Sequence, residues 1–106
     1  MTPQTAVQAG ALRAAAAFIE REDLPGLRVT AFAGAVFIEV PRAAGSPAAR
    51  TGLTARLAAA AGTDRIDRRP GPWQKTVTAV GRIGGYRAVI TTVIYDEEDE
   101  ERGATA

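Results

Sequence analysis

Two segments of alternating residues constrain the fold of this chain more than any other feature. Residues 27–40 and 73–95 each predict an antiparallel hairpin in which a single register gathers the apolar side chains on one face. In the first hairpin, a two-residue turn at Ala33-Gly34 makes the numbers of opposed residues sum to 67, so that Val29 faces Ile38. A one-residue slip would move the apolar set to the wrong face, which makes this register strongly specified. The turn itself would push Ala33 toward positive φ.

The second hairpin turns at Gly84-Gly85, and its opposed residues sum to 169. This register places Ala79 opposite Ile90 on the apolar face. It also places Arg82 beside Arg87, a like-charged pair that is unfavourable unless an anion neutralises it.

Two further segments predict helices. Thr2-Pro3 and Ser46-Pro47 each place a capping side chain before a proline that suits the first helical turn. The first helix should end at Pro25-Gly26, and the second should run to residue 61 before Gly62. The apolar stripe predicted for the second helix consists of Ala49, Leu53, Leu57, Ala60 and Ala61, with Arg50 and Arg56 pointing elsewhere.

The order helix–hairpin–helix–hairpin predicts an α+β fold, with a four-stranded antiparallel sheet and two helices on one of its faces. We expect residues 1–95 to form a single domain. Residues 63–72 read as a polar loop broken by prolines. Residues 96–106 read as an acidic disordered tail.

The charge of the chain is divided along its length. Its formal net charge of +1 conceals six consecutive acids at residues 96–101. Residues 1–95 hold 12 basic residues against six acidic ones, a net charge of +6, whereas the last eleven residues carry −5. A basic body followed by an acidic tail predicts a surface for polyanions, with the tail as a competitor for it.

The basic residues concentrate between residues 42 and 87, where nine of them face only Asp64 and Asp67. Arginines beside an exposed aromatic ring suit phosphate contact and base stacking. The alternative is that Trp73 packs on the core while the arginines solvate the surface. The predicted nucleic-acid-binding residues are Arg65, Arg68, Arg69, Trp73, Arg82 and Arg87.

The second hairpin is apolar on both faces, which suggests that something covers the face away from the helices. The predicted interface residues there are Val80, Val89, Val93 and Tyr95, and a partner subunit in a homo-oligomer would cover them. The alternative is the ordinary preference of strands for valine. The acidic run could also serve only to keep the chain soluble, or be an interaction element that presents carboxylates to a basic partner protein.

Catalysis is restricted by composition. Without His or Cys, the chain cannot form a histidine-based triad, a thiol nucleophile or an imidazole-ligated metal site. Asp64 and Asp67 could hold Mg²⁺ in a phosphodiesterase, but nearby arginines also explain them as parts of a charge-balanced loop. We therefore expect a protein that is not an enzyme and uses no cofactor or metal.

The expected location is cytoplasmic. The chain has no apolar run near 18 residues, so we expect no membrane contact. Its N-terminus does not resemble a signal peptide.

Several pieces of the chain resemble small proteins of actinobacteria and of their phages and mobile elements, most of them without a known function. They are residues 12–22 leading into Leu24-Pro25, residues 53–62, Trp73-Gln74-Lys75, and the turn at residues 83–87. The resemblance implies no activity. It implies a phage or mobile-element context, in which small non-enzymatic binders and inhibitors are common.

These patterns favour a small binding protein that contacts nucleic acid through its arginine-rich segment. The alternative is a protein-interaction module, an inhibitor or an assembly component, that acts through a sheet face or the acidic tail.

Overall fold

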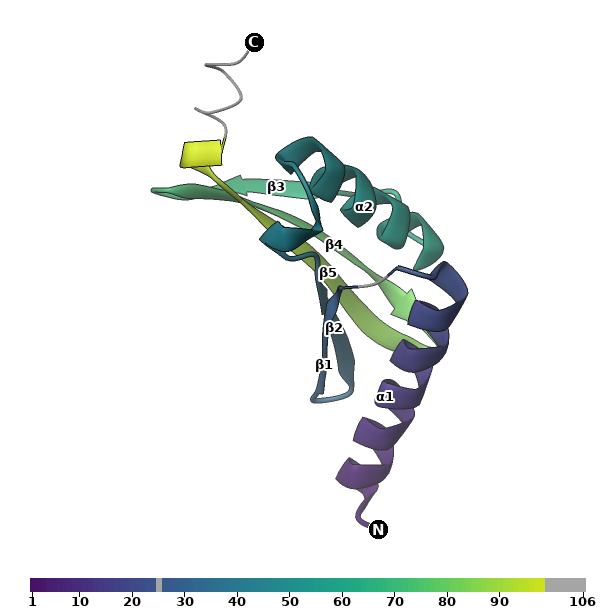
Figure 1. Ribbon diagram of the computed structural model, residues 1–106. Coiled ribbons are helices and arrows are strands. Elements are labelled where there is room, and N and C mark those ends of the chain that lie inside the picture. The colour runs from purple at the N-terminus through teal and green to yellow at the C-terminus, as the bar shows by residue number, and fades with distance from the viewer. Residues whose placement is uncertain (25, 99–106) are drawn as a thin grey trace.

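The computed structural model describes residues 1–24 and 26–98. A five-stranded sheet forms the centre, and both long helices lie against the same face of it (Figure 1). After the last strand, residues 96–98 form a helical turn. In chain order the elements are α1 (Pro3–Glu22), β1 (Arg28–Phe32), β2 (Ala35–Glu39), the 3₁₀ helix η1 (Arg42–Ala44), α2 (Pro47–Ala60), β3 (Asp67–Pro70), β4 (Gln74–Ile83) and β5 (Tyr86–Tyr95).

Both helices begin where the capping residues predict. The Thr2 hydroxyl accepts a hydrogen bond from the Thr5 amide at 3.1 Å, and the Ser46 hydroxyl accepts one from the Ala49 amide at 3.2 Å. Each bond satisfies an amide that has no partner within its helix. Asp23, in the left-handed region with φ 54°, ends α1. No helix in the described part of the chain is long and apolar enough to cross a membrane.

Both predicted hairpin registers are confirmed. Val29 pairs with Ile38 in β1–β2, and the β4–β5 pairs follow the predicted sum over ten positions, from Gln74 with Tyr95 to Ile83 with Tyr86. The first turn holds Ala33 at φ 51° and Gly34 at φ 74°. This is the primed geometry that a two-residue turn needs, and Ala33 accepts the strained conformation.

The predicted sheet was wrong in two respects. The observed sheet has five strands, not four, in the order β1-β2-β5-β4-β3. In addition, β2 pairs with β5 in parallel, so the sheet is mixed and not purely antiparallel. Residues 67–70 of the predicted loop form β3, which pairs with β4. Side-chain alternation specifies which residues pair within a hairpin. It does not specify which strand of one hairpin pairs with which strand of the other. An exposed edge strand needs no alternation, so its sequence carries no such signal.

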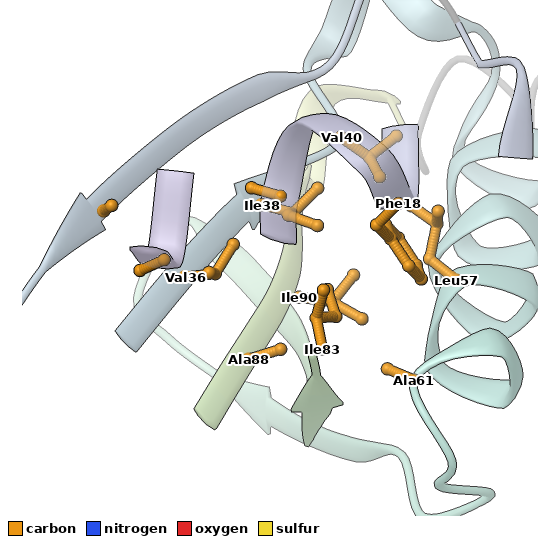
Figure 2. Packing of buried hydrophobic residues seen from close by; sticks show 12 residues of the cluster. Phe18, Val36, Ile38, Val40, Leu57, Ala61, Ile83, Ala88 and Ile90 are labelled. Carbon is orange, nitrogen blue, oxygen red and sulfur yellow. The ribbon is translucent and has the colours of Figure 1, made fainter. Parts of the chain in front are cut away.

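The core lies between the helix pair and the covered face of the sheet. Phe18 of α1 points into the space bounded by Leu57 of α2 and by the central strands (Figure 2). Ile38 and Ile90, neighbours across the parallel junction, are fully buried there. The predicted stripe of α2 is confirmed at Leu57 and Ala61, whereas Ala49 and Ala60 are exposed and Arg50 was wrongly assigned to solvent. The buried residues of α2 and its C-cap are Arg50, Thr54, Leu57, Ala58 and Ala61.

A close backbone approach at Gly81 joins α2 to β4. A Cβ atom at this glycine would lie 2.5 Å from the Ala61 carbonyl oxygen. That carbonyl accepts a hydrogen bond from the Arg82 amide at 2.9 Å. The missing side chain therefore lets the end of α2 bond directly to the sheet.

Candidate binding surfaces

The face of the sheet that α1 and α2 leave uncovered carries a band of apolar side chains. Phe37 of β2, Val89 of β5 and Val80 of β4 occupy neighbouring positions in one cross-strand row. Phe37 is 40% exposed and Val80 is 46% exposed. Val93 and Tyr95 lie farther along β5 on the same face, since side chains alternate along a strand. The four predicted interface residues thus share one face, and the unpredicted β2–β5 junction adds Phe37.

The predicted like-charged pair lies at one end of this face. Arg82 and Arg87 are directly opposed across β4–β5. Arg82 donates one hydrogen bond, from Nη1 to the Gly85 carbonyl at 3.2 Å. Among residues 1–24 and 26–98, no carboxylate lies within 4 Å of either guanidinium.

The other predicted nucleic-acid-binding residues lie around β3. Arg68 is opposite Val77 and Arg69 is opposite Thr76, so strand alternation directs the two arginines to opposite faces. Arg65 is in the exposed loop before β3. Trp73, just before β4, is 78% exposed, so the alternative in which it packs on the core is wrong.

These six residues do not converge on a pocket. Arg82 follows Trp73 by nine positions along β4, which corresponds to about 30 Å along a strand. The residues instead follow the β3–β4 side of the molecule from one end to the other. A small ligand could not touch them all, and Arg68 and Arg69 lie on opposite faces of the edge strand.

The salt bridges of the protein lie elsewhere. Within the described residues, glutamates pair with Arg28, Arg42, Arg50 and Arg56. Among the described residues no such pair forms between residue 63 and residue 87, where the exposed carboxylates are those of Asp64 and Asp67. The cations of this segment are Arg65, Arg68, Arg69, Lys75, Arg82 and Arg87.

The beginning of the acidic run is part of the folded structure. Glu98 is 7% exposed and receives two hydrogen bonds from the fully buried Arg50, at 2.9 and 2.7 Å. Arg50 also donates to the carbonyls of Gly45, at 2.7 Å, and Val93, at 3.0 Å. The sequence analysis missed this pair, because its members are 48 residues apart and no local pattern links them.

Glu98 is held as a carboxylate in this setting. Hydrogen bonds from Arg50 lower its pKa, burial opposes that effect, and the hydrogen bond from the Tyr95 amide and the charges of Arg50 and Arg42 lower it further. Arg42 makes two further contacts in this region. Its Nη1 lies 2.6 Å from a carboxylate oxygen of Glu97, and its guanidinium lies 5.6 Å from the centre of the Tyr95 ring.

The first acids of the run therefore bind Arg42 and Arg50, at the end of β5 opposite to Arg82 and Arg87. Residues 96–98 of the predicted tail form a helical turn, so disorder was the wrong prediction for them. The rest of that prediction, residues 99–106, lies outside the described residues.

Metal-binding groups are sparse in the part of the chain that the structure describes, which contains no group of three or more Asp or Glu side chains placed to hold a metal ion. Asp64 and Asp67 are both exposed, in the loop and at the start of β3.

Comparison with protein-family models, with curated proteins and with solved structures finds no match to this chain. The resemblance to small actinobacterial and phage proteins stays a prediction.

Proposed function

We propose that this protein is a non-enzymatic binding protein that contacts nucleic acid along its β3–β4 side. One observation carries the proposal: six cations follow this side of the molecule outside any salt bridge of the described residues. Nucleic acids repeat a negative charge along their length, so a line of cations suits them better than it suits a compact ligand.

Trp73 supports a single-stranded ligand. Its ring is 78% exposed and stands next in space to the arginines of β3, since Pro70 of that strand is paired with Lys75. Stacking of a base on an exposed aromatic ring contributes about 1–3 kcal/mol and needs no particular sequence. The ring lies at the end of the cationic line, where a strand that follows the arginines would arrive.

The first prediction concerns Arg68 and Arg69. Replacing both with alanine should weaken binding to single-stranded oligonucleotides and lower the slope of log K against log salt concentration by roughly 1.5, because two phosphate contacts are lost. Fluorescence anisotropy over a salt series measures both quantities. The matched control is Arg13→Ala with Arg21→Ala on α1, which changes the net charge equally and should have a smaller effect.

Trp73 provides a second readout, because it is the only tryptophan of the chain. A stacked base should quench its fluorescence at the same ligand concentrations that raise the anisotropy. The protein for these experiments should also be prepared as a chain that ends at Glu98. This form removes Asp99, Glu100 and Glu101 but keeps the Arg50–Glu98 pair, and it should bind more tightly if the acids compete. Absence of salt-dependent binding by this form, with DNA and with RNA, would refute the proposal.

A second candidate function is a protein-interaction module of the kind found in phage or mobile-element contexts. The observation that favours it is the exposed row of Phe37, Val89 and Val80 on the uncovered sheet face. The same preparations distinguish the two functions. A defined protein partner that stays bound after nuclease treatment, together with no quenching of Trp73 by oligonucleotides, would favour the interaction module.

A further inference from the structure

We infer that β1 is the pairing edge for a second copy of this chain, which would join two five-stranded sheets into one continuous sheet across a two-fold axis. β1 is the outermost strand at one end of the sheet, so its edge opposite to β2 faces outward. This inference does not depend on nucleic-acid binding.

The turn geometry shows which backbone groups face outward. A two-residue turn is closed by a hydrogen-bonded pair, here Phe32 with Ala35, and such pairs alternate with non-bonded ones along the hairpin. The N–H and C=O groups of Val29 and Ala31 therefore point away from β2. Gln8 Nε2 of α1 donates a hydrogen bond of 3.4 Å to the Ala31 carbonyl, which agrees with this direction, and a pairing strand would have to displace this bond.

The two edges of the sheet differ in their protection. The outer strand on the other side, β3, reads Asp67-Arg68-Arg69-Pro70, and all four residues are exposed. Charged residues and proline are the usual means by which an edge strand avoids further pairing. β1 has neither proline nor acid, and its single charged residue, Arg28, stands at its first position. Of the two edges, β1 is the one suited to accept another strand.

The helix beside this edge is apolar on its outer flank. Leu12, Ala16 and Ile19 recur at helical spacing along α1, and Leu12 is 47% exposed. Together with Val29 they line a groove of about 370 Å³ between α1 and the edge strand. A strand added to β1 would bring its own covering helix to this groove.

A second copy fits because β1 is complementary to itself. With Thr30 on the two-fold axis, antiparallel pairing places Val29 against Ala31 of the second copy. The outward N–H and C=O groups of both residues then meet once the long Gln8 bond to the Ala31 carbonyl is exchanged for a backbone bond. The same register places Arg28 against Phe32 of the second copy on the uncovered face, where Phe32 is 70% exposed and can stack with a guanidinium. The axis stands perpendicular to the sheet, so both α1 helices lie on one side and their apolar flanks approach each other.

The test is sedimentation velocity of the full chain over a concentration series, which should give twice the chain mass of 11.1 kDa. Val29→Pro removes an outward N–H without removing a bond to β2, and Ala16→Glu places a charge on the exposed flank of α1. Each variant should weaken dimerisation at least tenfold. Circular dichroism should show that both variants stay folded, and Ala16→Glu is informative even if the proline variant does not fold.

Val80→Asp on the uncovered sheet face is the comparison variant, and it should leave the dimer intact. A chain that remains monomeric at high concentration would overturn the inference. A dimer that survives both Val29→Pro and Ala16→Glu but dissociates in Val80→Asp would also overturn it, because the interface would then be the uncovered sheet face. Loss of oligonucleotide binding with the dimer intact would count against the proposed function only.

Discussion

The largest fully buried side chain among the described residues is that of an arginine. Removing a guanidinium from water costs several kcal/mol. Arg50 offsets this cost with a bidentate contact to the Glu98 carboxylate and with hydrogen bonds to two backbone carbonyls. Its Nε is buried without a hydrogen-bond partner among the described residues, so the compensation is incomplete. Loss of the carboxylate would leave the charge buried without a counterion.

Glu98→Gln should therefore destabilise the fold by about 3–5 kcal/mol, the typical effect of removing one partner of a buried ion pair. Urea unfolding followed by circular dichroism measures the difference. Glu97→Gln is the matched control, because Glu97 is 62% exposed and its pair with Arg42 is at the surface. The control should change stability by less than about 0.5 kcal/mol. If the two variants lowered the free energy of unfolding equally, burial of the Arg50–Glu98 pair would not be what makes it stabilising.

The same pair predicts how stability varies with pH. The pKa of Glu98 is lowered in the folded state, so the unfolded state takes up a proton first as the pH falls. The stabilisation is complete above the ordinary carboxyl pKa of about 4.3 and is lost as the pH falls through the lower, folded-state value. The difference in stability between the original chain and Glu98→Gln should be full at pH 7 and shrink in acid. A difference that is independent of pH would contradict the assigned charge state.

At the scale of elements, the docking of α2 on β4 depends on Gly81. Gly81→Ala should destabilise the fold by about 1–3 kcal/mol, because the added methyl group overlaps the Ala61 carbonyl, which is backbone and cannot rotate away. Gly52→Ala is the control, because Gly52 lies within α2 with no neighbouring atom within 4 Å of an added Cβ. That change should stabilise the protein by up to about 1 kcal/mol. Thermal unfolding of both variants tests the pair, and a stable Gly81→Ala protein would show that the contact can relax.

Elements were predictable where the pattern was local. Capping residues located both helix starts, and side-chain alternation gave the register of both hairpins. The burial of Arg50 on α2 was not predictable, because it depends on a carboxylate 48 positions later. For the candidate surfaces, the sequence placed Val80 and Val89 on one face but could not add Phe37, which reaches them only through the β2–β5 junction.

At the scale of the whole molecule, residues 96–98, which follow the last strand, are part of the fold. A chain that ends at Tyr95 lacks Glu98 and leaves Arg50 buried alone, whereas one that ends at Glu98 keeps the pair. The shorter form should be less stable by several kcal/mol, and the longer form should match the full chain. Chemical denaturation of the three forms checks this. Similar stability of the two truncated forms would show that residues 96–98 do not support the fold.

The order of the strands has a consequence for how the protein is made. β5 lies in the middle of the sheet, between β2 and β4, yet it is the last strand to leave the ribosome. Until it emerges, the first hairpin has no neighbour on its inner edge and Phe18 has no complete core to enter. Folding should therefore await the emergence of β5, and a nascent chain without it would present its unpaired strands to other proteins.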